Sequence, residues 1–376
     1  MENFSIQDRV REQYNRAPYP QINWLASCPQ SSIAHSTYET GAALVKNRRE
    51  SHRKKRLALL GCGTFEPYAL GAWQKGASID AVDLSLRTLS RARWRCRLHL
   101  VNNVQFHESD LIEFSAKNKE LYDYIHCYGV LHHLPEPQKG FVALAQALKP
   151  DGFARIMVYS KASRRKPQLI QKAATLLGLQ KNHDWALMDK FMDLLPWSHP
   201  LKLAYAFNPD NASPSGIVDS ALHACENSFS IDDLLETLDS SGLILSAWDF
   251  SQNTLNLLQD QRENDLQLLQ RLRYLEAFDQ WPAAYTFWVQ KKGAAVLKPG
   301  APMIYAAIPP PPLWQRRVDS TVLRRSVKIT AGHLRLWRRC YKAPQNKDLV
   351  SKNPLSSESV AMTELLKARF LLEVKS

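Results

Sequence analysis

Two glycines and an acidic residue are spaced in a way that suits the binding of a nucleoside. Gly61 and Gly63 follow a short apolar run, residues 57–60, whose composition is typical of a buried parallel strand. Glycine lets the backbone approach a ligand that a Cβ would keep away. Asp83 ends a second apolar run 22 positions after Gly61 (83 − 61), close to the spacing of roughly 20 at which a carboxylate meets ribose hydroxyls in a βαβ unit.

The turn after the first strand lacks the third glycine of a dinucleotide fingerprint, because Phe65 stands at that place. No cluster of backbone donors for a pyrophosphate is evident, which favours a nucleoside ligand without one. S-adenosylmethionine (SAM) is the obvious candidate. Ordinary strand-to-helix turns also contain glycine pairs, so this interpretation needs support from the ends of the next strands. Asp110 follows a third strand, where a carboxylate can accept from an adenine amino group.

Strands and helices alternate regularly through most of the chain. Right-handed βαβ crossovers then predict an α/β fold with a Rossmann-like, seven-stranded, mostly parallel sheet and helices on both faces. The expected strands are residues 57–60, 79–82, 104–107, 122–128, 153–159, 243–250 and 285–290. Helices are expected at residues 86–100 and 231–239. The first carries arginines at i, i+4 spacing, which indicates either an anionic partner or an ordinary solvated face.

The composition shifts along the 376 residues. We expect an N-terminal strap and lid segment (1–56), a core domain (57–292) with an insertion at 160–227, a Pro-rich linker (293–313) and a basic helical appendage (314–376). Net charge is +13, and residues 293–376 hold 15 Lys and Arg against 5 Asp and Glu. This basic end indicates either attraction to phosphate-rich surfaces or a solvated tail.

Other function classes are disfavoured by the sequence. No run approaches the roughly 18 apolar residues of a membrane span, and no signal peptide is evident, so a cytoplasmic protein is expected. The six cysteines show neither C-x-x-C pairs nor His-Cys metal spacing. We therefore predict no metal site and no disulfide framework.

The motifs resemble, in order and spacing, those of class I SAM-dependent methyltransferases. They are Leu60-Gly61-Cys62-Gly63-Thr64, Val82-Asp83-Leu84-Ser85, Ser109-Asp110-Leu111, Gly129-Val130-Leu131-His132-His133-Leu134 and Leu148-Lys149-Pro150-Asp151-Gly152. A narrower resemblance covers residues 10–292 and is to a poorly characterised bacterial branch often fused behind TPR repeats. No TPR repeat is visible in this sequence.

The resemblance implies roles for the matching residues. Gly61, Cys62 and Gly63 would border the methionine part of the cofactor, and Asp83 with Leu84 would hold the ribose. Asp110 and Leu111 would frame the adenine, and the segment Cys127, Tyr128 and Gly129 would line the sulfonium end. Phe65 and Leu60 depart from the family pattern, and Asn227 replaces the branch's second histidine after His223.

Four residues are candidates for proton transfer from an O- or N-acceptor. His132 and His133 follow the fourth strand, beside the expected methyl group, although paired histidines there can simply shape the turn. His223 and Glu226 lie three apart, so both can face the pocket if that stretch is helical. The alternative is a structural pair on the lid.

Tyr14 and Tyr19 are candidates for substrate binding. Prolines flank Tyr19 and hold its segment extended, so that the ring can cap a pocket or serve as a packing anchor. The favoured function is methyl transfer to a small molecule or peptide. The alternatives are an RNA methyltransferase that uses the basic tail, and an inactive methyltransferase fold that acts as a binding or regulatory protein.

Overall fold

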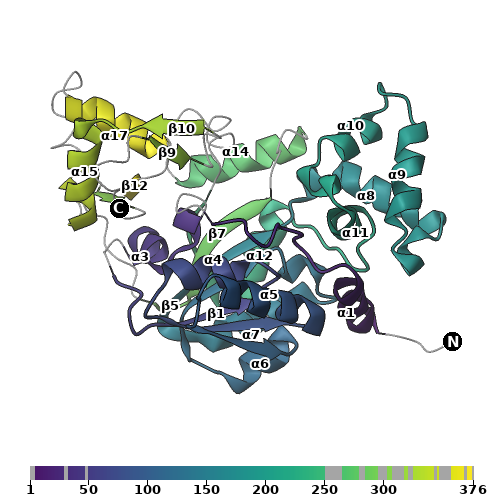
Figure 1. Cartoon of the computed structure of the whole chain (residues 1–376), viewed down its shortest axis with the longest axis horizontal. Helices are drawn as coiled ribbons and strands as arrows, with labels where there is room; N and C mark the ends of the chain where they lie inside the picture. Colours follow the sequence, from purple (N-terminus) through teal and green to yellow (C-terminus); the bar gives the residue numbers. More distant parts are fainter. Residues whose placement is uncertain are drawn as a thin grey trace.

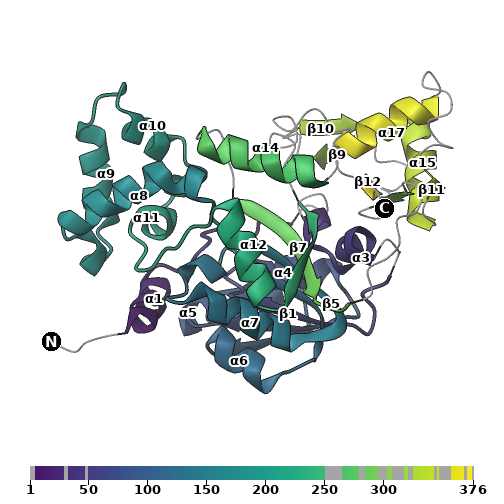
Figure 2. The ribbon, with the colours of Figure 1, turned by 180° about the vertical axis from the view of Figure 1, so that it is seen from behind.

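A central α/β domain lies between a helical lid and a small C-terminal unit (Figures 1 and 2). The computed structural model describes residues 5–28, 33–46, 50–249, 265–278, 284–294, 303–306, 317–320, 325–342, 345–346, 357–367 and 371–374. None of the helices in these ranges combines the length and apolar character that a membrane span requires.

The central sheet has seven strands in the order β3-β2-β1-β4-β5-β7-β6. The pairs among β1 to β5 are parallel, whereas β7 runs antiparallel to both β5 and β6. The seven-stranded, mostly parallel sheet predicted from the sequence is therefore confirmed. The strands are β1 (Arg56–Leu60), β2 (Ser78–Asp83), β3 (Val104–Glu108), β4 (Tyr122–Tyr128), β5 (Leu148–Val158), β6 (Leu243–Trp248) and β7 (Tyr285–Lys291).

Strand order explains where a ligand can bind. The chain moves outward from β1 to β3 in one direction and from β4 to β5 in the other. Loops that follow β1 and β4 therefore diverge, and ligands of open parallel sheets bind in the crevice that this divergence leaves at the carboxyl ends of the strands. The predicted glycine turn, Asp83 and the paired histidines all lie at this edge.

Helices cover both faces of the sheet. One face packs against α3 (Tyr38–Lys46), α4 (Glu66–Trp73) and α5 (Leu86–Leu98). The other packs against α6 (Leu111–Lys117), α7 (Pro137–Ala147), α12 (Ile231–Ser240) and α14 (Asp265–Ala277). The helices predicted at 86–100 and 231–239 correspond to α5 and α12. Ser85 and Ser230 begin them, because each serine side chain accepts a hydrogen bond from a first-turn amide.

The insertion forms a separate helical layer with its own apolar core, which we call the lid (residues 161–221). Ile170, Met188, Met192, Tyr205 and Ile217 fill this core. The lid contains α8 (Lys161–Leu176), η3 (Leu179–Asn182), α9 (Trp185–Leu194), α10 (Pro200–Ala206), η4 (Pro209–Ala212) and α11 (Pro214–Ala221). The helix α1 (Ile6–Arg16), which begins at a Ser5–Asp8 capping box, lies beside it (Figure 1).

The C-terminal unit mixes helices and strands, whereas the sequence predicted a helical appendage. Residues 303–306 of the expected linker form a strand that pairs with residues 345–346 and 371–374, and such long-range pairing has no local signal. Trp337 is fully buried in this unit. The Pro309–Pro312 run lies outside the described residues. The elements are β8 (Met303–Ala306), β9 (Arg317–Ser320), β10 (Arg325–Lys328), α15 (Ala331–Lys342), β11 (Gln345–Asn346), α17 (Ser357–Lys367) and β12 (Leu371–Val374).

Arg95 of α5 binds the N-terminal strap, which we define as residues 17–28. Arg95 is buried and donates to the backbone carbonyl oxygens of Ile22 at 2.6 Å and Asn23 at 2.9 Å. Its guanidinium also lies 5.5 Å from the ring centroid of Trp24 and 5.3 Å from that of Phe65. At this position, therefore, the arginine row meets carbonyls of the chain itself instead of an anionic partner.

We expect Arg95→Met to lower the free energy of unfolding by roughly 2–4 kcal/mol, because the strap carbonyls lose their buried donor. Arg97→Met on the exposed side of the same helix is the matched control and should change stability by less than about 0.5 kcal/mol. Urea unfolding of both variants measures the difference. Equal stabilities would show that Arg95 does not hold the strap.

Candidate active site

The turn after β1 requires glycine at two positions. Gly61 and Gly63 have φ angles of +70° and +57°, in the left-handed region that favours glycine. A Cβ on Gly61 would also lie 2.4 Å from Cγ2 of Val130, which follows β4. The amides of Gly61 and Cys62 both donate to the Val82 carbonyl at 2.9 Å, so the turn is fastened to the end of β2.

Asp83 is held beside this turn by backbone donors. Its Oδ2 accepts from the Gly63 amide at 3.1 Å, and its Oδ1 accepts from the Ser85 amide at 2.9 Å. Burial raises the pKa of Asp83 to about 6, although these two amides oppose the rise. A carboxylate offers about four acceptor sites, so two remain for a ribose diol.

Asp110 has a local structural role. It begins α6, where its Oδ1 accepts from the amides of Ile112 at 2.7 Å and Glu113 at 3.1 Å. Its Oδ2 accepts from Nε2 of Gln7 on α1 at 2.7 Å. In this arrangement α1 occupies the side of the carboxylate that was assigned to an adenine amino group. Leu111 is buried in the core.

The side chains of the expected sulfonium segment differ in exposure, because Cys127 is buried and Tyr128 is exposed. The Cys127 side chain is fully buried in the core, and burial raises its pKa to about 12. The Tyr128 ring centroid lies 4.8 Å from the Arg155 guanidinium. Gly129 has a φ of +78° and turns the chain toward η2 (Leu131–His133). The Cys62 side chain is also buried, and Leu84 is half-buried.

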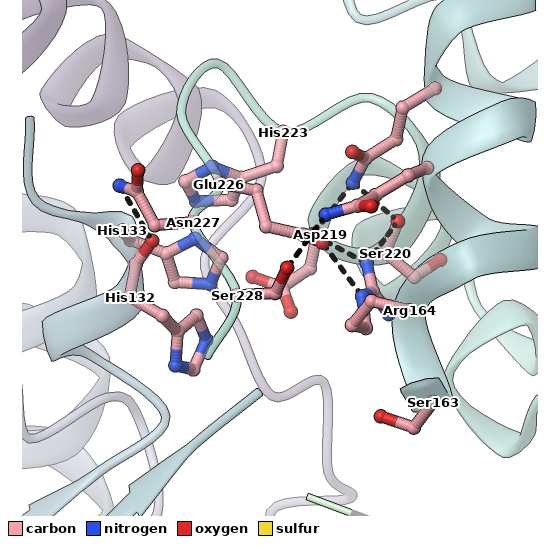
Figure 3. Close-up of polar contacts among 12 residues, drawn as sticks. His132, His133, Ser163, Arg164, Asp219, Ser220, His223, Glu226, Asn227 and Ser228 are labelled. Carbon is pink, nitrogen blue, oxygen red and sulfur yellow. Dashed lines mark hydrogen bonds and ion pairs between the residues drawn. The ribbon is translucent and has the colours of Figure 1, made fainter. Parts of the chain in front are cut away.

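The structure brings His133 and His223 together (Figure 3). Their rings stack with centroids 3.6 Å apart at 19°. Nδ1 of His133 lies 2.8 Å from the Cys225 carbonyl and must donate to it, which leaves Nε2 with a lone pair. Nδ1 of His223 accepts from the Cys225 amide at 3.0 Å, so Nε2 of His223 carries the proton. Burial lowers the pKa of His133 to about 4, and that of His223 lies well below its usual value.

Tyr14 connects this pair to a residue that no sequence pattern indicated. Its hydroxyl donates to Oδ1 of Asp219 at 2.7 Å and lies 3.2 Å from Nε2 of His223, from which it accepts. Asp219 is buried on α11, and burial raises its pKa to about 7. An aspartate beside Ile217 and Val218 is a weak signal of a buried carboxylate, but nothing in the sequence pairs it with α1.

His132 is buried against the Tyr159 ring, with centroids 3.8 Å apart. Neither of its ring nitrogens has a hydrogen-bond partner among the described residues. Asn227, which was expected to replace the second histidine of the narrower branch, holds the segment after the lid against η2. The backbone N–H of Asn227 donates to the His132 carbonyl at 2.7 Å, and its side-chain Nδ2 donates to the Leu134 carbonyl at 2.8 Å.

Glu226 forms a structural ion pair (Figure 3). Its Oε1 accepts from Nε of Arg164 at 2.7 Å, and its Oε2 accepts from Gln171 at 2.7 Å. The spacing in the sequence predicted that a helix could turn His223 and Glu226 to one side. The condition for this arrangement is not met, because α11 ends at Ala221 and the two side chains have different partners.

Tyr19 contacts the lid and the glycine turn. Its hydroxyl donates to Oδ1 of Asp210 at 2.8 Å, while its backbone carbonyl accepts from the Thr64 amide at 3.2 Å. Phe65 packs against Tyr68, with ring centroids 5.6 Å apart, and under Arg95. The aromatic residue at the family's glycine position therefore takes part in the packing of α4 on α5.

Comparisons with known proteins agree with the fold. Residues 60–154 match the family described as a methyltransferase domain. The chain is 27% identical over 247 residues to the protein named uncharacterized protein syc1184_c of Synechococcus sp., covering 64% of this chain and 59% of that one. It is 27% identical over 145 residues to the ubiquinone biosynthesis O-methyltransferase of Salmonella paratyphi A, covering 38% and 59%. The chain spans 59% of the length of each of these two curated relatives.

A similar fold occurs in PKMT2 from Rickettsia typhi in complex with AdoHcy. The TM-score is 0.57, and the two chains are 12% identical over 96% of this chain and 78% of that chain. The α/β methyltransferase fold expected from the motifs is confirmed. The methyltransferase match covers residues 60–154 of the expected core domain, and the bounds of that domain, 57–292, stay a prediction. The expected association of the narrower branch with TPR repeats stays a prediction.

We expect Glu226→Leu to lower the free energy of unfolding by about 3–5 kcal/mol, because the buried Arg164 guanidinium loses its carboxylate. The double variant Arg164→Met, Glu226→Leu should regain most of this loss, since it removes both charges. Urea unfolding is the measurement. The exposed Lys161–Asp233 pair provides the control, and Lys161→Met should cost less than about 1 kcal/mol. A loss below about 1 kcal/mol in Glu226→Leu would contradict the structural role.

Proposed function

We propose that this protein is a SAM-dependent methyltransferase that acts on an O- or N-acceptor in a small molecule or peptide. The observation that carries the proposal is the Asp83 carboxylate, held beside the Gly61–Gly63 turn by a hydrogen bond from the Gly63 amide. The matched methyltransferase domain, residues 60–154, contains all of these residues.

The residues at the strand ends fit an adenosyl group. Asp83 keeps acceptor sites for two ribose hydroxyls, and the left-handed glycines let the backbone approach the methionine portion. SAM, when bound, supplies a methyl group on a sulfonium that is already a good leaving group. The chain then has to orient the acceptor, exclude water and provide a place for the acceptor's proton.

The lid and α1 favour an acceptor site above η2. His132 and His133 on η2, Tyr14 on α1 and His223 after the lid meet there. Two unpartnered nitrogens on the buried His132 support a polar ligand at this place, because burying polar atoms without partners is costly.

The alternatives receive less support. The basic C-terminal unit lies at the opposite end of the domain from the lid (Figures 1 and 2), so its charge is far from the proposed acceptor site. This separation favours a small-molecule or peptide acceptor over RNA. An inactive fold would be expected if the Phe65 ring crowded the cofactor, but that ring packs with Tyr68 and Arg95.

Calorimetric titration with SAM tests the proposal directly. We expect the wild type to bind SAM, and Asp83→Asn to bind it about 10- to 100-fold more weakly, because an amide accepts hydrogen bonds less strongly than a carboxylate. The single asparagine oxygen can still accept from the Gly63 amide, but the Ser85 amide then loses its acceptor. The control is Glu113→Gln, a change of an exposed side chain on α6, and this variant should bind SAM like the wild type. Absence of SAM binding by the wild type would refute the proposal.

The same titration should depend on pH. Because burial raises the pKa of Asp83 to about 6, the carboxylate becomes protonated as the pH falls through this value. Wild-type SAM affinity should therefore decrease below about pH 6, and Asp83→Asn should lack this decrease. Parallel profiles for the two proteins would show that Asp83 does not contact the ligand.

A further inference from the structure

We infer that Asp219 is the base that accepts the proton of the methyl acceptor, and that this acceptor is an aromatic compound with a neutral hydroxyl group. The inference rests on the proposed function and extends it to the other half of the site. Nothing in the sequence motifs or in the comparisons assigns a role to Asp219.

Two hydrogen-bond acceptors converge above η2. Asp219 is buried, and its Oδ1 is positioned by the Tyr14 hydroxyl at 2.7 Å, which leaves acceptor capacity on the carboxylate. The Cys225 carbonyl holds the proton of His133 on Nδ1, so Nε2 presents a lone pair. Side-chain ligand atoms of His133, Asp219 and His223 all lie within 4.8 Å of one another. A hydroxyl group that donates its one hydrogen to the Asp219 carboxylate is the complementary ligand.

The charged groups around Asp219 leave it as the base of the site. Arg164 on α8 faces it but is paired with Glu226, and Asp210 on η4 accepts from Tyr19. Burial raises the pKa of Asp219 to about 7, and the Tyr14 hydrogen bond opposes the rise. A carboxylate with a pKa near neutrality suits general base catalysis.

The uncharged groups around Asp219 favour a neutral aromatic ligand. Three tyrosines lie close to Asp219: Tyr14 on α1, Tyr19 on the strap and Tyr159 at the end of β5. Two histidines complete these surroundings, His133 on η2 and His223 in the segment after the lid. Burial lowers the pKa of His132, His133 and His223, so the site penalises positive charge. An ammonium acceptor would meet the same penalty, whereas a neutral hydroxyl would not.

The proposed step balances in atoms and charge. The acceptor oxygen forms a bond to the methyl carbon, and the carbon–sulfur bond breaks with its electron pair left on sulfur. The hydroxyl proton moves to the Asp219 carboxylate and leaves to solvent when the product departs. Tyr14 is a positioning residue, because it orients Asp219 and fixes its proton affinity.

A metal ion at the same cluster is the competing interpretation. His133, Asp219 and His223 are common ligand types. Their geometry opposes it, since the two imidazole rings are stacked with centroids 3.6 Å apart at 19°, so that their in-plane lone pairs lie in two nearly parallel planes. In addition, Nδ1 of His223 accepts from the Cys225 amide, which places the ring proton on Nε2, the nitrogen that would have to bind the ion.

Calorimetric binding of 2-naphthol and 2-methoxynaphthalene tests the inference without turnover. The second probe carries a methyl group in place of the hydroxyl hydrogen of the first. Wild-type protein should bind 2-naphthol about tenfold more tightly as the pH rises through about 7, because the ionised Asp219 carboxylate accepts the hydroxyl. Binding of 2-methoxynaphthalene should be weaker and independent of pH over this range.

Two variants separate a base from a structural carboxylate. Asp219→Asn keeps an oxygen for the Tyr14 hydroxyl but should lose the pH dependence of 2-naphthol binding. Tyr14→Phe removes the hydrogen bond that lowers the pKa of Asp219, so the midpoint of the profile should move to higher pH. Both variants should bind SAM like the wild type, which keeps this test distinct from that of the proposed function.

Three results would overturn the inference. The first is equal binding of the two probes, or no binding of either. The second is a pH profile of 2-naphthol binding that Asp219→Asn leaves unchanged. The third is micromolar binding of Zn²⁺ that Asp219→Asn abolishes. Normal SAM binding together with any of these would refute the role of Asp219 while leaving the proposed methyltransferase intact.

Discussion

The hydrogen bond from the Gly63 amide to the Asp83 carboxylate joins the ends of β1 and β2, and the proposed cofactor site depends on it. It forms only because Gly63 adopts a left-handed conformation and because the order of the sheet places these two strands side by side. The buried core on both faces of the sheet keeps the two strand ends in register. The carboxylate therefore meets a ligand in a fixed orientation, with little reorganisation.

The helix α1 connects this cofactor half to the acceptor half. Gln7 donates to Asp110 at the end of β3, Gln13 accepts from the Ala224 amide after the lid, and Tyr14 donates to Asp219. One short helix thus contacts both sides of the proposed site.

The sequence predicted the parts of the molecule that depend on local pattern. Apolar runs and the spacing of Gly61 and Asp83 led to the seven strands of the sheet, to α5 and α12 and to the sheet class, since these signals act over short separations. The pairing of Tyr14 with Asp219 spans 205 positions and leaves no local trace. The ion pair of Glu226 could not be predicted because its partner, Arg164, lies 62 positions away on another helix. The C-terminal strands were missed for the same reason.

A crystal structure of the protein with bound AdoHcy is the measurement that tests the central claim most directly. The account predicts that the ribose hydroxyls donate to the Asp83 carboxylate while the Gly63 amide keeps its contact, and that the homocysteine portion lies along the Gly61–Gly63 turn. A ligand bound elsewhere, or a ribose without contact to Asp83, would contradict it.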